Sequence, residues 1–286
     1  MNTTRSSNFA AMLRTTALLA GLTGLLVVIG ALIGGPETAL MFLFFALAFN
    51  LAMFWFSDKI ALKMSGAQPM TEEQAPRIYE MVRELTSAAK MPMPALYVIP
   101  QAQPNAFATG RSPSHSAVAV TAGITQLLSP NELRGVIAHE LAHISNRDTL
   151  TQTVAASIGG AITYLGYMLM WFGGDDESPL SLIASLALVL LAPIAASIIQ
   201  LAISRQREYA ADATGAQFAG DPESLASALL RLEEGSKATP MQVNQATECL
   251  YIVKPFRGKG ISNLFSTHPP IEERVRRLRQ MRPALG

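Results

Sequence analysis

The stretch SPNELRGVIAHELAHISN, residues 129–146, decides how the polar part of this chain folds. Ser129 is followed by a proline and, three residues later, by Glu132, which is a capping box with proline at the first helical position. The pattern predicts a helix from Pro130 to about Asn146. Apolar residues recur along it between the polar ones, so we expect one side of this helix to pack in a core.

Two histidines, His139 and His143, lie four residues apart on the predicted helix. Side chains at this spacing project from one face a turn apart, so both imidazoles can bind one metal ion. Glu140 is placed to reach a water on the metal, where a carboxylate can take the proton of that water. The pattern indicates a zinc hydrolase site. The alternative is a capped surface helix with two incidental histidines, and its apolar neighbours argue against that.

A third ligand must come from elsewhere, because catalytic zinc sites commonly use three protein ligands and leave the fourth position to water. The segment SRQREYAAD, residues 204–212, places Glu208 and Asp212 four residues apart. We expect Glu208 to be the third ligand and Asp212 to accept the outer N–H of a ligating histidine. Arg205 is a further candidate behind the ligands. Alternatively, the two acids balance Arg205 and Arg207 at the start of a solvated helix.

The composition favours a membrane protein, because 50% of the 286 residues are hydrophobic and only 15% are charged. Each of four uncharged runs is near the ~20 residues that cross hydrocarbon: residues 15–33, 39–56, 153–172 and 180–203. We expect two transmembrane helical hairpins. For the third run, the alternative is a buried hairpin inside a soluble domain. The net charge of +1 gives no general attraction to nucleic acid, and Cys249, the single cysteine, cannot form an internal disulfide.

Lys and Arg lie only outside the two predicted hairpins, so the positive-inside rule puts both termini and both polar segments in the cytoplasm. An even number of crossings also puts Glu208 on the same side as the histidines. The expected organisation is a tail and first hairpin, a cytosolic catalytic part, a second hairpin, and a cytosolic part with the third ligand, over residues 1–57, 58–152, 153–203 and 204–286.

The polar segments predict α+β structure. Residues 71–90 have helical apolar spacing, and β-branched residues predict strands at 95–100 and 116–121, with 105–110 as a third. We expect these strands to form a small antiparallel sheet. Residues 239–262 have the most loop-like composition, and the five arginines between residues 274 and 282 predict a helix side that faces water or lipid headgroups.

The chain resembles the HtpX-type heat-shock membrane proteases, relatives of the CAAX-prenyl protein peptidases, along essentially its whole length. The matching features are both hairpins and four motifs: PNAFATG (104–110), HELAH (139–143), SRQREYAAD (204–212) and THPP (267–270). The resemblance implies a gluzincin-like domain with one Zn²⁺ on His139, His143 and Glu208, and Glu140 as base. It also implies a bacterial inner-membrane location and a role in stress response and membrane-protein quality control.

Further residues follow from the resemblance. PNAFATG looks like the edge strand beside the cleft, so Asn105, Ala106 and Phe107 are expected to bind an extended substrate backbone. The segment alone is equally consistent with a surface hairpin. His268 could donate to the oxyanion, or be a turn histidine; His115 has no assigned role. The expected partners are protein substrates, mainly membrane proteins, the lipid bilayer, and other quality-control proteases.

Two rival functions remain. An intramembrane zinc protease of the site-two type would embed the metal helix in the bilayer, but polar residues crowd both ends of that helix. A zinc-binding membrane scaffold or chaperone would not hydrolyse anything. Glu140 and only three proposed ligands favour the enzyme, because structural zinc sites are usually closed by four protein ligands.

Overall fold

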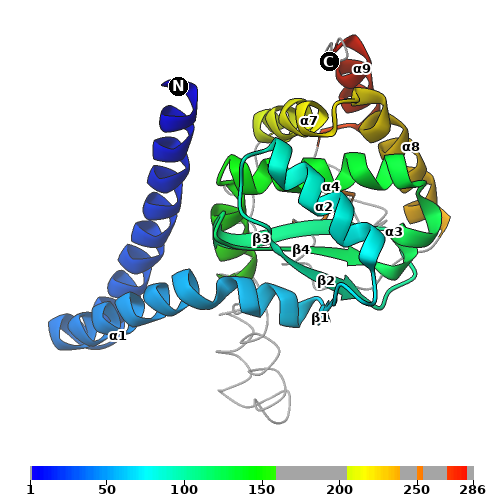
Figure 1. Ribbon diagram of the computed structural model, residues 1–286. Coiled ribbons are helices and arrows are strands. Elements are labelled where there is room, and N and C mark those ends of the chain that lie inside the picture. The colour runs from blue at the N-terminus through cyan, green and yellow to red at the C-terminus, as the bar shows by residue number, and fades with distance from the viewer. Residues whose placement is uncertain (1, 159–204, 239–249, 254–268, 282–286) are drawn as a thin grey trace.

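The computed structural model describes residues 2–158, 205–238, 250–253 and 269–281 of the protein. Within them, helices enclose a four-stranded sheet, and a long amino-terminal helix extends away from it (Figure 1). In chain order the elements are α1 (Asn2–Met64), β1 (Gln68–Pro69), α2 (Pro76–Ala88), β2 (Ala95–Ile99), β3 (Ala106–Ser112), β4 (His115–Thr121), α3 (Ala122–Leu127), α4 (Pro130–Ser145), α7 (Arg205–Ala219), α8 (Pro222–Ala238) and α9 (Ile271–Gln280).

The sheet is mixed, with strand order β1-β2-β4-β3. β3 pairs with β4 and β1 with β2 in antiparallel fashion, whereas β2 and β4 are parallel. The expectation of an antiparallel sheet was therefore wrong for its central pair. The strand positions were right, but residue alternation shows which face a side chain takes and not which way the neighbouring strand runs. Because β4 turns back from β3 into the middle of the sheet, it runs in the direction of β2.

Both faces of the sheet are covered, and side chains alternate between them. Ala106, Ala108, Val118 and Val120 join the larger core, which α2, α4, α7, α8 and α9 complete. Phe107 faces a second core, together with Ala117 and Ala119 of β4. The end of α1 and residues 250–251 complete this second core. β3 is thus buried although it is an edge strand.

Helix α4 has the predicted limits and the predicted start. Ser129 N–H donates to Glu132 Oε2 at 2.8 Å, and Glu132 N–H donates to Ser129 Oγ at 3.4 Å. All but the ends of α4 are buried, which agrees with the expectation of an internal helix. α2 begins at Pro76 rather than near Thr71, because residues 71–75 form turns that precede the proline.

A glycine lets α7 lie directly against α4. A Cβ atom on Gly215 would lie 2.8 Å from both the N and Cα atoms of His139, closer than real side chains approach. One turn earlier on α4, a Cβ on Gly135 would lie 2.6 Å from the N atom of Leu225 on α8. The three helices therefore pack at short distance, and α7 brings its acidic residues up to the α4 histidines.

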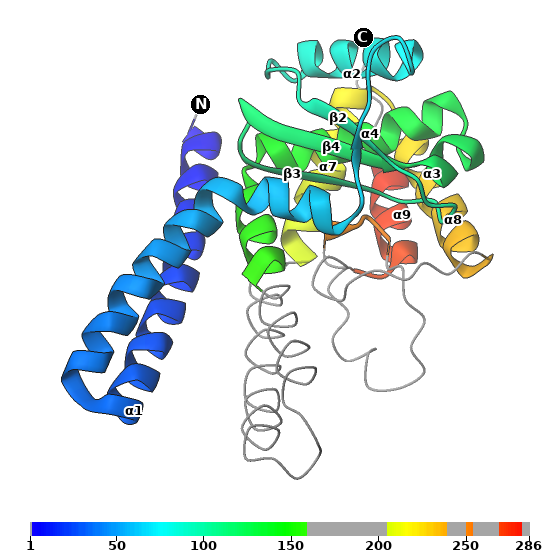
Figure 2. The same cartoon turned by 90° about the horizontal axis from the view of Figure 1, so that it is seen from below.

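Helix α1 folds back on itself near Gly35, where φ is +72°, and forms two arms (Figures 1 and 2). Asn50 on the second arm donates to the Leu19 carbonyl oxygen at 3.1 Å and to Thr23 Oγ1 at 2.7 Å on the first. Residues 35–64 are long and apolar enough to cross a membrane. The two arms contain the predicted runs 15–33 and 39–56.

The third predicted run begins inside the protein. Residues 148–158 are helical and mostly buried. Thr153 Oγ1 lies 3.0 Å from Thr109 Oγ1 of β3, and Ser157 Oγ donates to the Ser57 carbonyl oxygen at 3.2 Å. These contacts tie the helix to both the sheet and α1. The rest of the second predicted hairpin lies outside the described residues.

Candidate metal centre and active site

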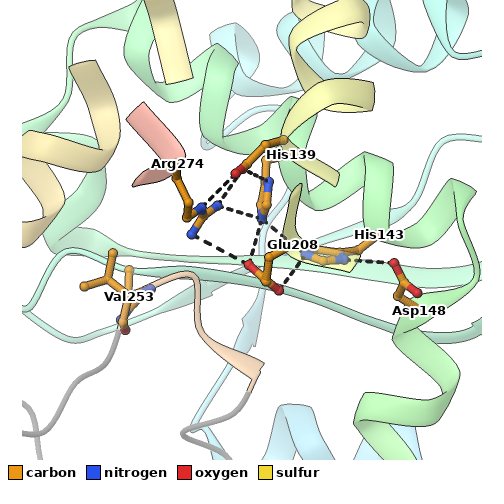
Figure 3. A network of polar contacts seen from close by, with 8 residues as sticks. His139, His143, Asp148, Glu208, Val253 and Arg274 are labelled. Atoms are coloured by element: carbon orange, nitrogen blue, oxygen red, sulfur yellow. Dashed lines mark hydrogen bonds and ion pairs between the residues drawn. The ribbon is translucent and has the colours of Figure 1, made fainter. Parts of the chain in front are cut away.

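Three ligand-type side chains converge in the core. His139 and His143 come from α4 and Glu208 from α7, and one ligand atom of each lies within 4.8 Å of the others. The two Nε2 atoms are 3.2 Å apart, and the Glu208 carboxylate oxygens lie 3.8 Å from His139 Nε2 and 3.5 Å from His143 Nε2 (Figure 3). All three side chains are buried, so the fold places them in the core and shields them from solvent.

Each histidine has a carboxylate at its other ring nitrogen. Asp212 Oδ1 lies 3.0 Å from His139 Nδ1, and Asp148 Oδ2 lies 3.3 Å from His143 Nδ1. A carboxylate there favours a proton on Nδ1 and leaves Nε2 free to bind a metal. Because both Nε2 atoms face Glu208, the donor set has the orientation that a shared metal requires.

A buried guanidinium closes the centre. Arg274 of α9 donates to Asp212 through Nε at 2.9 Å and Nη2 at 2.7 Å, and its Nη1 lies 3.6 Å from Glu208 Oε2. Arg274 and Asp148 lie on opposite sides of the two histidines (Figure 3). The arginine side chain is fully buried, so its charge acts on these carboxylates with little solvent screening.

Glu140 lies next to the ligands and at the sheet edge. Its carboxylate accepts a hydrogen bond from the Ala108 backbone N–H of β3. Burial raises the pKa of Glu140 to about 7, with the charge of Glu208 acting in the same direction. A carboxyl group whose pKa lies near 7 can both accept and return a proton at neutral pH, which is what general acid–base chemistry requires.

The histidines have opposite pKa shifts. Burial, with His143 and Arg274 acting in the same direction, lowers the pKa of His139 to about 4. For His143, burial acts downward, but the hydrogen bond that its ring donates to Asp148, together with the charges of nearby carboxylates, outweighs burial and raises the pKa to about 9. A proton on His143 thus offsets part of the negative charge of the nearby carboxylates.

The charge count of the centre fits a divalent cation. The buried groups around the histidines are four carboxylates and two guanidinium groups: Glu140, Asp148, Glu208, Asp212, Arg207 and Arg274. With neutral histidines and all four carboxylates ionised, four negative and two positive charges leave −2, which is costly in a core unless it is compensated. Two imidazoles and one carboxylate are also a common donor set of catalytic zinc sites.

The structure places the other predicted site residues as follows. Arg205 is exposed at the start of α7, whereas Arg207 is buried, with its Nη1 3.8 Å from Asp148 Oδ1. Asn105, Ala106 and Phe107 are fully buried at the start of β3. His268 and Cys249 lie outside the described residues.

Three residues of the centre were not predicted: Asp148, Arg207 and Arg274. Asp148 follows the end of α4, and a turn with φ of +60° at Arg147 brings it back to His143. Arg274 was expected on a solvated helix side, and this was wrong. A signal for it existed in the sequence, because Arg274 lies on the apolar face of α9 with Ile271, Val275 and Leu278 at helical spacing.

Comparisons with known proteins agree with this geometry. Residues 72–282 match the model described as Peptidase family M48. Proteins named "Protease HtpX homolog" from Pelotomaculum thermopropionicum and Persephonella marina are 53% and 52% identical to the chain. The first match covers 94% of this chain and 98% of the relative, and the second 96% and 98%. The crystal structure of S. mikatae Ste24p has a TM-score of 0.52 and 18% identity, with 96% of this chain and 66% of that chain covered, which shows a similar fold alone. The chain therefore belongs to peptidase family M48 and is a metallopeptidase.

Proposed function

We propose that the chain is a zinc-dependent membrane endopeptidase that cleaves misfolded or damaged membrane proteins from the cytoplasmic side, as part of quality control under stress. The observation that carries the proposal is the convergence of His139, His143 and Glu208 beside the buried carboxyl group of Glu140. A closed structural zinc site would need a fourth protein ligand. Among the described residues, the group that could hold a metal has three.

When bound, zinc would supply Lewis-acid polarisation of the scissile carbonyl and activation of the attacking water. His139, His143 and Glu208 would hold it. Asp212 and Asp148 keep the two imidazoles in the required orientation through their Nδ1 atoms. Glu140 takes the proton of the attacking water on its carboxylate and passes it to the nitrogen of the leaving amine.

Exposed apolar side chains on α1 support the membrane location. The second arm exposes Phe44, Phe45, Leu51 and Trp55, among others, although large exposed apolar patches are rare on soluble monomers. Arg111 of β3 lies over the Trp55 ring, 4.7 Å from its centroid. This pair suits the boundary between lipid and water, where aromatic and basic side chains gather. The absence of Lys and Arg from the predicted hairpin loops supports a cytoplasmic catalytic domain and cytoplasmic termini.

The site chemistry is tested with the full-length protein in detergent, loaded with zinc and incubated with an unfolded membrane protein. Replacing Glu140 by Gln keeps the size of the side chain but removes the proton acceptor. We expect cleavage to fall by about 10²–10⁴-fold while one zinc per chain remains bound. Glu234→Gln, an exposed change on α8, is the matched control and should cleave like the wild type.

Equal cleavage by wild type and Glu140→Gln, with zinc bound in both, would refute the role of Glu140. No cleavage by either protein, again with zinc bound, would favour a zinc-binding membrane scaffold or chaperone. Cleavage of soluble and membrane substrates at equal rates would argue against the proposed substrate class. Protease accessibility of tags at both termini, in oriented vesicles, tests the cytoplasmic orientation.

A further inference from the structure

An irregular segment, residues 250–253, covers the start of edge strand β3; we call it the strap. The Ile252 N–H donates to the Ala106 carbonyl oxygen at 3.1 Å. The Asn105 side chain binds Val253 twice, because Nδ2 donates to the Val253 carbonyl oxygen at 2.7 Å and Oδ1 accepts the Val253 N–H at 3.3 Å. The first is the backbone contact with which a sheet edge holds an added strand, and the Asn105 amide pairs with the next residue in the same way as a peptide group.

The strap and Glu140 meet the same edge of β3. The Ala106 carbonyl oxygen accepts from the strap, and two residues further along, the Ala108 N–H donates to Glu140. Two residues of a strand span about 7 Å, so an extended peptide held at Ala106 would continue past Glu140. A peptide bound along this edge of β3 would therefore lead to the metal ligands, and the strap occupies the first part of the edge, at Ala106.

The Asn105 amide is fixed for binding one residue of a neighbouring chain. Asn105 is fully buried, its N–H donates to Thr121 Oγ1 at 2.8 Å, and its Oδ1 also accepts from the Ala106 N–H at 3.1 Å. Without the strap, Nδ2 would lose the Val253 carbonyl oxygen, and a buried donor without a partner is costly. Another backbone in the place of the strap would keep Nδ2 paired.

The strap also shows which side chains this edge accepts. Ile252 and Val253 are only 3% and 7% exposed and join the larger core, so their surroundings are apolar. Tyr251 packs edge-on against Phe107, with ring centroids 5.2 Å apart, and anchors the preceding part of the strap in the second core. Tyr251 is thus held in the second core, separately from the core that Ile252 and Val253 join.

We propose that the strap occupies the substrate's place on β3 in the free enzyme, and that a substrate displaces Ile252 and Val253 and puts two apolar residues there. This inference rests on the proposed endopeptidase function. It makes the enzyme self-inhibited, and it selects apolar segments of unfolded membrane proteins. The substrate residue that takes the place of Ile252 cannot be proline, because proline has no N–H to donate to the Ala106 carbonyl oxygen.

The test compares Ile252→Pro with Ile252→Val in the full-length zinc enzyme, using an apolar fluorogenic peptide. Proline removes the N–H that binds Ala106, whereas valine keeps it together with an apolar side chain. Because one hydrogen bond of the competing strap is lost, we expect KM to fall about threefold to tenfold with kcat unchanged. Ile252→Val should keep the wild-type KM. Damage to the structure would lower kcat instead.

A folded, zinc-loaded Ile252→Pro protein with an unchanged or higher KM would overturn the proposal. Hydrogen exchange in Glu140→Gln gives a second answer that needs no variant of the strap. Saturation with the peptide should expose the Ile252 and Val253 amides to exchange, and amides that stay protected would also overturn the proposal. If neither wild type nor Ile252→Pro cleaves the peptide, the endopeptidase function is refuted. Hydrogen exchange still tests whether the peptide displaces the strap, because that experiment requires only peptide binding.

Discussion

Helix α4 buries ionisable side chains in the core, whereas the second arm of α1 exposes large apolar ones. α4 buries His139, Glu140 and His143, which are 1%, 2% and 5% exposed. The second arm of α1 leaves Phe44 and Phe45 65% and 61% exposed. Each arrangement is unfavourable for a protein alone in water, because charges avoid the core and large apolar surfaces avoid the solvent. The proposed metal ion would compensate the first, and contact with lipid would compensate the second.

The two helices therefore differ in how their unfavourable side-chain placement is compensated. Around α4 the compensation is local, because the buried arginines and the proposed divalent cation would together balance the carboxylates. Around α1 it is extended, because a whole apolar surface must meet another medium. Substitutions on α4 and its neighbours should change stability and chemistry, whereas those on α1 should change the interaction with detergent or lipid.

The largest expected effect in this comparison comes from the buried charges. Arg274→Met leaves the Asp212 carboxylate buried beside Glu208 with its two hydrogen bonds lost, so we expect a loss of about 3–5 kcal/mol in the free energy of unfolding. Denaturation in detergent micelles measures it. Arg276→Met removes an exposed arginine of the same helix, which pairs with Glu273, and should leave the midpoint unchanged. Similar midpoints for both variants would contradict the role of Arg274 in charge balance.

A matched pair of leucines compares the two helices directly. Leu141 of α4 is fully buried, and Leu47 of α1 is 53% exposed. Leu141→Ala should cost about 2–5 kcal/mol because it leaves a cavity in the core. Leu47→Ala should leave the unfolding free energy in detergent nearly unchanged and reduce partition into vesicles. An equal loss of stability in both variants would mean that this face of α1 packs against protein.

A smaller effect is expected where α7 crosses α4. Gly215→Ala places a methyl group against the backbone of His139, so α7 must move away, at a cost of about 1–3 kcal/mol. Because Glu208 lies on α7, zinc affinity should fall in the same variant. Competition with a chromogenic chelator measures this. Gln217→Ala, an exposed change on the same helix, is the control, and equal zinc affinity in both would exclude this coupling.

The sequence predicted those parts of the centre that depend on local spacing. The capping box at Ser129 defined the start of α4, and four-residue spacing put His139 and His143 on one face. The same spacing singled out Glu208 and Asp212, which the structure brings to the α4 histidines. The roles of these residues in metal binding and catalysis stay predictions.

The parts that were missed depend on tertiary contacts. Helical spacing puts Arg274 on the apolar face of α9, but only its contact with Asp212 of α7 shows that it is an internal counter-charge. The strap lies within residues 239–262, whose composition indicates a loop, and no local pattern shows that a loop will bind β3. The parallel pairing of β2 with β4 likewise depends on where the chain inserts a later strand.

The position of Arg274 along the chain has a consequence for biosynthesis. Synthesis proceeds from the amino terminus, so His139, His143 and Glu208 all exist before Arg274 is added. Until α9 docks, Asp212 lacks its guanidinium partner, and the closed, water-excluding arrangement of the centre is disfavoured. A nascent chain thus carries all three proposed metal ligands before the centre has its buried counter-charge.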